Sequence, residues 1–240
     1  MQPNIFMWGG LLKSLIDSDL HIVLDIVKSS KNSRYNRNKI AGNTQPIWLT
    51  IPYINFKRDK KICDQKLDTS KNTTKKLINS FTERYSEARY FNKSLYLLEN
   101  TLCMNKDISN LSEVYLNFLN TLKDIGTPLC KIKFASDLFN ENYEFKTLNG
   151  VHLVNKILEI TKAETYLASE NTIHYAEPYE YNISELWIQK FTSKEYLQFN
   201  FKEQKSFEPN LSILDIFSYL NIEEITKNLH ESNYWKKIKN

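Results

Sequence analysis

Apolar residues in the first 53 positions change from helical to strand spacing. Residues at positions 11, 12, 15 and 16 recur at the interval of an amphipathic helix. The segment HIVLDIV (residues 21–27) is almost continuously apolar, which is typical of a strand covered on both faces. QPIWLTIPY (45–53) has the composition of another strand, and Pro52 is expected to stop it. The pattern therefore predicts a helix followed by two strands.

A helical region occupies the middle of the chain. Residues 57–74 are rich in lysine and asparagine and predict an exposed loop. Helical spacing then extends from about 75 to 125, with breaks near 89–92 and 105–107. The clearest helix lies within residues 111–126 and is expected to stop at Gly126 and Pro128.

Strands and helices alternate towards the C-terminus. CKIKFAS (130–136), TYLAS (165–169) and WIQKFTS (187–193) predict strands, and GVHLVNKILEITKA (150–163) predicts a helix. Such alternation favours parallel strands joined by helical crossovers. We therefore expect one α/β domain over residues 1–240. It would contain an open, mainly parallel sheet flanked by helices, with a helical insert or flank at about 75–125.

Composition excludes several classes of protein. The chain of 240 residues is 41% hydrophobic and 25% charged, which suffices for a substantial core. No apolar run approaches the roughly 18 residues that cross a membrane, and no signal-peptide pattern is present, so we expect a soluble, cytoplasmic protein without membrane insertion. The net charge of +4 is spread along the chain. This spread favours solvated lysines and argues against nucleic acid as a partner.

The cysteines and histidines do not form a disulfide framework or a metal motif. Three widely separated cysteines predict reduced thiols: Cys63, Cys103 and Cys130. Four histidines show no HxxxH spacing: His21, His152, His174 and His230. We expect no structural metal and no tightly bound cofactor.

Polar side chains follow three of the predicted strands. Asp25, Ser136 and Ser169 each lie at or near the carboxyl end of a strand. Ligands of open parallel sheets bind beyond these ends. If the strands are neighbours, the three side chains converge on one crevice, and the loop KNSRYNRNKI (31–40) emerges from the same edge.

That loop has the chemistry of a ligand site. Arg37 offers a planar fork of donors suited to a phosphate or a carboxylate. Asn36 and Asn38 add amides suited to sugar hydroxyls or the edge of a base. Together they predict a site for a nucleotide-linked sugar. The alternative is a polar turn whose asparagines satisfy their own backbone.

Asp25 is the candidate general base, or a partner for a substrate hydroxyl or amine. His21 shares its strand face but would lie about 13 Å away, so the two cannot form a dyad. His21 is expected to be a core histidine. The alternative for Asp25 is a structural ion pair with Arg34 or Arg37.

PNLSILDIF (209–217) has the signature of a helix start. Ser212 and Asp215 have the S-x-x-D spacing of a capping box, in which Ser212 would accept from the backbone of Asp215. The four tryptophans are expected to pack in the core or at its rim: Trp8, Trp48, Trp187 and Trp235. Trp8 could instead form a stacking wall for a base or a sugar.

Several of these segments together resemble the WbqC-like protein family. QPNIFMWGG, DLHIVLDIV, KNSRYNRNKI and WLTIP follow the order of its pattern, which is roughly QPxxxPWxGYF, DxFVxLDxVxF, an NRN-containing loop and W-L-T-x-P. Weaker similarity continues at FTERYSEARYF, GTPLCKIKFASDL, AETYLAS and PNLSILDIF. The chain departs from the pattern at Met7, where proline is common, and at Gly10 and Leu11, which replace an aromatic pair. ASEN (168–171) lacks the glycine often found after the serine, and relatives usually carry a short apolar strand before QP.

The resemblance implies an enzyme of bacterial O-antigen or capsule biosynthesis that handles an activated amino sugar. The preferred hypothesis is a transferase that moves an acyl or aminoacyl group to the sugar nitrogen by direct attack, with Asp25 as the base. Its partners would be a nucleotide sugar and an acyl donor. Two alternatives stay open: a nucleotide-activating enzyme, although the HxGH motif is absent, and a non-catalytic sugar-binding protein of the same pathway. The positions implied to bind substrate are Gln2, Asn4, Trp8, Lys31, Asn36, Arg37, Asn38, Thr50, Ser136, Ser169, Asn210, Ser212 and Asp215.

Overall fold

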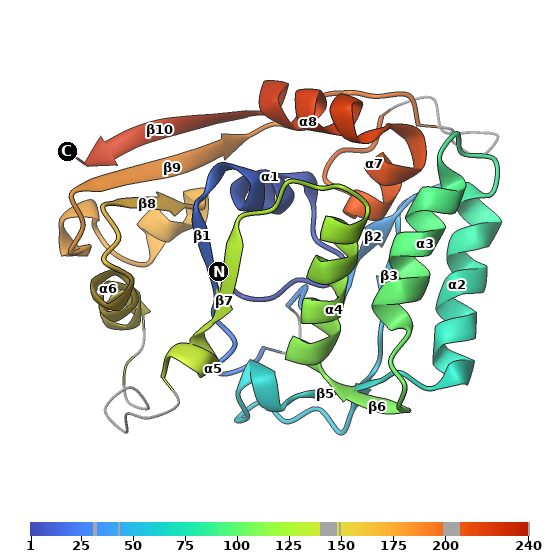
Figure 1. Cartoon of the computed structure of the whole chain (residues 1–240), viewed down its shortest axis with the longest axis horizontal. Coiled ribbons are helices and arrows are strands. Elements are labelled where there is room, and N and C mark those ends of the chain that lie inside the picture. The colour runs from blue at the N-terminus through green and yellow to red at the C-terminus, as the bar shows by residue number, and fades with distance from the viewer. Residues whose placement is uncertain (31–32, 43, 140–147, 149, 199–206, 240) are drawn as a thin grey trace.

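The computed structural model describes residues 1–30, 33–42, 44–139, 148, 150–198 and 207–239. Figure 1 shows α2, α3 and α4 at one end of the molecule, β8 to β10 with α6 at the other, and β1 and β7 between them. The helices are α1 (Gly9–Asp17), α2 (Lys71–Tyr85), α3 (Phe91–Leu102), α4 (Leu111–Asp124), α5 (Ala135–Leu138), α6 (Gly150–Thr161), α7 (Ile213–Tyr219) and α8 (Ile222–Glu231). The strands are β1 (Leu20–Val23), β2 (Arg37–Ile40), β3 (Ile47–Thr50), β4 (Tyr53–Ile54), β5 (Lys66–Asp68), β6 (Ile108–Asn110), β7 (Lys131–Phe134), β8 (Thr165–Ala168), β9 (Glu185–Phe191) and β10 (Asn233–Lys239). Short 3₁₀ turns are η1 (Ile62–Asp64), η3 (Glu170–His174) and η4 (Pro178–Glu180).

The strands of the described chain pair in small sheets, two of which contain parallel pairs. β1 pairs with β7 and β8 pairs with β9 in parallel, whereas β10 is antiparallel to β9. β2–β3 and β4–β5–β6 are antiparallel. The mixed α/β class is confirmed, but the expected open, mainly parallel sheet is not what these pairings form. Only residues 41–46 join β2 to β3, and a connection this short is below the dozen or more residues that a parallel crossover needs.

The first residues extend the pairing of β1. The Met1 amino group donates to Ile22 O at 2.6 Å, and Leu24 N donates to Met1 O at 2.8 Å. These two hydrogen bonds form a parallel pattern. They lie on the edge of β1 opposite β7, because the edge that faces β7 forms its hydrogen bonds through odd-numbered residues. One of these is Asp19, whose carbonyl accepts from Lys131 N. Residues 2–4 consequently continue beyond the carboxyl end of β1.

Two expected loops contain regular structure. Residues 37–40 form β2, and within 57–74 the chain forms η1, β5 and the start of α2. In β5 the fully buried Leu67 lies between the more exposed Lys66 and Asp68. A three-residue alternation of this kind is hidden in a lysine-rich run when only composition is considered. The lysine-rich C-terminal segment, residues 233–239, is also a strand, β10, paired with β9.

The helices of residues 71–124 share the main core with the N-terminal segment. Phe81, Tyr85 and Phe118 are fully buried in the same apolar cluster as Ile5 and Phe6. The region is therefore part of the core of the molecule. The prediction for the helix at 111–126 is confirmed by α4, which starts with an Asn110–Glu113 capping box and is followed by Gly126 at a φ of 89°.

A second, smaller apolar cluster lies under β8 and β9. Leu158 of α6 packs there with Ala168, Leu186 and Ile188.

Within the described part of the chain, every helix is too short or too polar to span a bilayer.

Candidate functional site

Asp25 and Ser136 meet where two parallel strands end. Val23, the last residue of β1, is in register with Phe134, the last residue of β7. The Asp25 carboxylate, two residues beyond β1, accepts from Ser136 N at 3.0 Å and from Ser136 Oγ at 2.7 Å. The parallel pairing thus brings together two polar residues that lie 111 positions apart.

The Asp25 carboxylate is surrounded by serine hydroxyls from the first turns of two helices, α4 and α5. Asp25 is fully buried, and Ser112 in the first turn of α4 donates a third hydrogen bond at 3.3 Å. The N-terminal end of α4 adds a favourable partial positive charge. Among the described residues no ion pair joins Asp25 to Arg34 or Arg37, so the structure does not support the alternative of an arginine partner, and serines bind the carboxylate instead.

Cys63 lies beside the backbone of Asp25 but is a poor nucleophile. Its backbone N–H donates to Asp25 O at 2.9 Å. Burial, with smaller contributions from Asp25 and Asp64, raises the pKa of the Cys63 thiol to about 11. The reactive form is the thiolate, which is scarce at neutral pH when the pKa is this high.

The NRN segment divides its side chains between two faces of β2. Asn36 is buried and donates to Ile51 O at 2.6 Å, and Asn38 is buried and donates to Phe6 O at 2.6 Å. Because neighbouring residues of a strand face opposite ways, Arg37 lies on the other, partly exposed face. The asparagine amides therefore donate to backbone carbonyls, which is close to the alternative interpretation. The difference is that these carbonyls belong to segments distant in sequence and not to the same turn.

The outer face of the β2–β3 pair carries Arg37, Thr50, Lys39 and Trp48. Arg37 is in register with Thr50, and Lys39 with Trp48. The Arg37 guanidinium carbon lies 4.6 Å from the centre of the Trp48 ring, within the range of a cation–π contact. Trp48 is 43% exposed, so the prediction that it packs in the core or at its rim is wrong.

The first five residues link the edge of β1 near Asp25 to the segment that precedes β2. Ile5 N donates to Tyr35 O at 2.9 Å, and the Tyr35 hydroxyl donates to Gln2 Oε1 at 3.2 Å. The N-terminal segment therefore runs from the edge of β1 to the start of β2. Four extended residues span at most about 13 Å, which limits the distance that this segment can cover.

Two buried polar atoms in this region have no hydrogen-bond partner within the described residues. They are Asn4 Oδ1 and the Tyr53 hydroxyl oxygen. Burial, reinforced by Tyr35 and opposed by Arg37, raises the pKa of Tyr53 well above its ordinary value, so it stays a neutral donor. A buried polar atom without a partner is costly, and such atoms are often satisfied by a ligand or water. The sequence analysis did not single out these two tyrosines, although Tyr35 directly precedes NRN and Tyr53 directly follows WLTIP.

Asp215 forms a separate buried cluster. Its carboxylate accepts from the Tyr85 hydroxyl at 2.7 Å, from Gln198 Nε2 at 2.8 Å and from the Tyr196 hydroxyl. Burial raises the pKa of Asp215 even though these three donors oppose the shift. The same burial and the neighbouring Asp215 raise the pKa of both tyrosines. The cluster joins α2, α7 and residues 196–198.

The predicted cap at Ser212 differs in detail. Ser212 Oγ accepts from Leu214 N at 3.3 Å, whereas Asp215 N donates to the Ser212 carbonyl at 2.9 Å. The Asp215 carboxylate does not accept from Ser212 N, as a capping box would require, because it is occupied by the two tyrosines and Gln198. Ser212 N also donates to Lys39 O at 2.8 Å, which ties α7 to β2.

The other predicted residues lie outside these two carboxylate clusters. The Trp8 ring packs edge-on against Phe191 with centres 5.0 Å apart. Asn210, at a φ of 59°, pairs with the Ser193 hydroxyl at 3.0 Å. Ser169 contacts Thr172 at 3.3 Å beyond β8, and no contact among the described residues brings it to Asp25. Lys31 lies outside the described residues.

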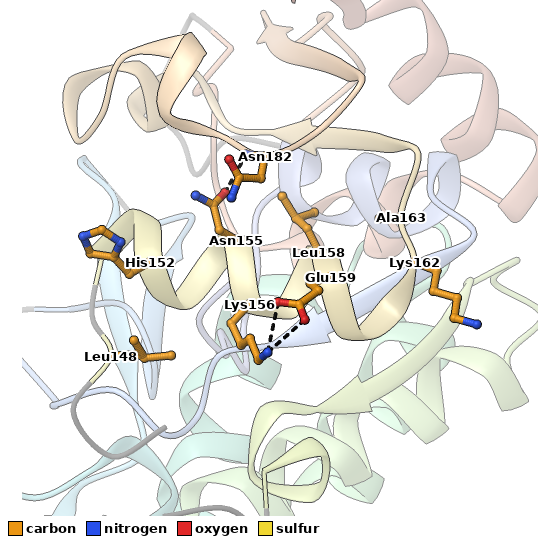
Figure 2. A pocket seen from close by; sticks show the side chains of 9 residues that line it. All are labelled: Leu148, His152, Asn155, Lys156, Leu158, Glu159, Lys162, Ala163 and Asn182. Carbon is orange, nitrogen blue, oxygen red and sulfur yellow. Dashed lines mark hydrogen bonds and ion pairs between the residues drawn. The ribbon is translucent and has the colours of Figure 1, made fainter. Parts of the chain in front are cut away.

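One hollow on the surface does not coincide with the predicted residues. It measures about 600 Å³ and follows one face of α6. Figure 2 shows Asn155 paired with Asn182 and Lys156 paired with Glu159 along this hollow. A much smaller crevice of about 20 Å³ lies beside Tyr196 and Ser212, which is room for a single water. Neither hollow supplies a nucleophile with a base, and the described residues contain no cluster of three metal-ligating side chains.

Comparison with known proteins agrees with the motif order. No curated protein and no solved structure matched the chain. A family model described as the WbqC-like protein family matches residues 2–227. This span contains Asp25, Arg37, Ser136 and Asp215 and covers most of the 240 residues. The chain belongs to the WbqC-like protein family.

Proposed function

We propose that this protein is a transferase of bacterial surface-polysaccharide biosynthesis that acylates the amine of a nucleotide-linked amino sugar. Membership of the WbqC-like family supports the role in polysaccharide biosynthesis. The meeting of Asp25 with Ser136 beyond the carboxyl ends of β1 and β7 supports the interpretation as an enzyme, because ligands of parallel sheets bind beyond these ends.

The proton route in this proposal passes through Ser136. Asp25 is fully buried, whereas Ser136 is partly exposed and donates to Asp25 Oδ2 at 2.7 Å. The sugar amine would attack the acyl carbonyl carbon, forming the N–C bond and breaking the bond from that carbon to the donor's leaving group. The amine proton would pass to Ser136 Oγ as the serine proton moves to Asp25. The departing group leaves with the electron pair of the broken bond.

The groups around Arg37 would hold the substrate. Arg37 can pair with a phosphate in a bidentate way. Asn4 Oδ1 would accept from a sugar hydroxyl, and the Tyr53 hydroxyl would donate to one, because both atoms are buried without a protein partner in the described chain. These contacts orient the sugar between Arg37 and the Asp25–Ser136 pair.

A non-catalytic sugar-binding protein is the second candidate, and one observation favours it. Three donors already occupy the Asp25 carboxylate, which ties the end of β1 to the starts of α4 and α5. A carboxylate in this environment can serve as a structural tie alone. In that case binding of the sugar would persist when the proton route is removed.

A product assay with two serine variants separates these candidates. Purified protein is incubated with nucleotide-linked amino sugars and acyl donors, and acylated product is measured by mass spectrometry. Ser136→Ala removes the hydroxyl but keeps the backbone donor to Asp25. Its matched control is Ser18→Ala, another partly buried serine, whose hydroxyl donates to Ser14 O at the far end of β1.

The proposal expects Ser136→Ala to lower kcat by about 100-fold or more with KM little changed, and Ser18→Ala to leave both near the wild-type values. Full turnover by Ser136→Ala would refute the proton route. Binding of a nucleotide sugar in calorimetry without product from any donor would favour the binding protein. Absence of both binding and product would overturn the proposed function.

A further inference from the structure

Three cations converge on one exposed tryptophan. The distances from the Trp48 ring centre are 4.6 Å to the Arg37 guanidinium, 5.8 Å to the Arg34 guanidinium and 5.9 Å to the Lys39 ammonium. Trp48 is 43% exposed. Lys39 faces it directly across the β2–β3 pair, and Arg37 is two residues away on the same face.

The pair of strands that carries Arg37, Lys39 and Trp48 is anchored from its inner face. Leu49 and Ile40 are buried in the main core. Asn38 donates to Phe6 O, and Lys39 O accepts from Ser212 N at 2.8 Å. The cations are therefore presented by an anchored surface that need not be ordered when a ligand binds.

Carboxylates of the described residues do not account for the position of Arg34 and Lys39 beside Trp48. The ion pairs of the described residues include neither Arg34 nor Lys39. Like charges held close together repel one another, and an anion placed among them is attracted by all of them. Arginine forks fit the oxygen geometry of phosphate groups, whereas lysine adds a compact charge.

We propose that Arg34, Lys39 and Trp48, together with Arg37, bind the diphosphate of the nucleotide-linked sugar. The choice of ligand rests on the proposed function. The diphosphate would lie over the cations around Trp48. Arg37 also lies close enough to Tyr53 to act on its pKa, so the attached sugar would extend towards Tyr53 and Asn4.

Calorimetry with two double variants tests the site. Arg34→Gln/Lys39→Gln removes two of the cations. Lys71→Gln/Lys75→Gln removes two exposed lysines of α2 and serves as the charge-matched control. Each protein is titrated with UDP, dTDP and inorganic pyrophosphate at low and high salt. Intrinsic fluorescence of the wild type and of Trp48→Phe shows whether a signal on binding comes from this ring.

We expect the Arg34→Gln/Lys39→Gln variant to bind each diphosphate at least about tenfold more weakly, while the control stays within about twofold of wild type. The fluorescence change should be lost in Trp48→Phe. Tight binding of UDP or dTDP by wild type that the Arg34→Gln/Lys39→Gln variant retains would overturn this site and leave the proposed function standing. Pyrophosphate binding that this variant loses, with neither nucleotide diphosphate binding more tightly than pyrophosphate, would support the anion site and count against the proposed function. Absence of any binding by wild type would overturn the site.

Discussion

The Tyr85 hydroxyl connects the buried Asp215 to the end of β2. It donates to Asp215 Oδ1 at 2.7 Å and accepts from Ala41 N at 2.8 Å. Tyr85 is fully buried. Tyr85→Phe would therefore remove one of three donors to a carboxylate and leave a buried backbone N–H without its acceptor.

The magnitude follows from these two losses. A hydrogen bond to a charged group contributes about 1.5–3 kcal/mol, and an unpaired buried N–H costs about 1–3 kcal/mol. Since such terms are not fully additive, we expect Tyr85→Phe to lower the free energy of unfolding by about 3 kcal/mol. For a chain of this size, that corresponds to a fall in Tm of about 6–12 °C.

Tyr115→Phe is the matched control. Tyr115 is also fully buried, but its hydroxyl has no partner within the described residues. Removing a desolvated hydroxyl without a partner should change the free energy of unfolding by less than about 1 kcal/mol, or stabilise the protein. Both variants are compared with wild type by chemical denaturation followed by circular dichroism. Equal losses for the two variants, or a larger loss for Tyr115→Phe, would refute the reasoning.

The pH dependence gives an independent check. Burial raises the pKa of Asp215, so the folded state holds this proton more tightly than the unfolded state. The contribution to stability is therefore greatest below the unfolded pKa and falls as the pH rises towards the folded pKa. Tyr85→Phe removes a donor that favours the ionised form, which raises the folded pKa further. The loss caused by the substitution should thus be larger at pH 7 than at pH 4.

Two further predictions concern the backbone and the thiols. Gly126 has a φ of 89°, and a Cβ added there would meet nothing within 4 Å, so Gly126→Ala should cost about 1–2 kcal/mol through backbone strain alone. Gly126→Asn should cost less in the same denaturation assay, since asparagine tolerates this conformation; equal costs would contradict the account. Because the pKa of Cys63 is about 11, its alkylation at pH 8 should be slow and should rise with pH, while the exposed Cys103 is modified first. Mass spectrometry of the peptides follows both rates, and faster modification of Cys63 at pH 8 would count against the buried environment.

The sequence by itself determined the elements with strong periodicity. The apolar stripe at 111, 114, 115, 118, 119 and 122 is buried in α4, and the stop signal at Gly126 ends that helix as expected. It also determined the family, because the ordered motifs from Gln2 to Asp215 fall within the matched span. The meeting of Asp25 and Ser136 followed from one rule of parallel pairing, and the structure places them in hydrogen-bond contact.

Only the tertiary structure decided which side chain of the NRN segment points away from the core. The same three residues would all be accessible in a loop, but pairing with β3 makes residues 36–40 alternate, so the asparagines point into the core and Arg37 points out. The partners of Asp25 and Asp215 come from distant helices and strands, and a contact of this kind leaves no periodic trace in a single chain. Local patterns report how a segment buries its own apolar face, whereas the environment of a polar group depends on which segments the completed core brings beside it.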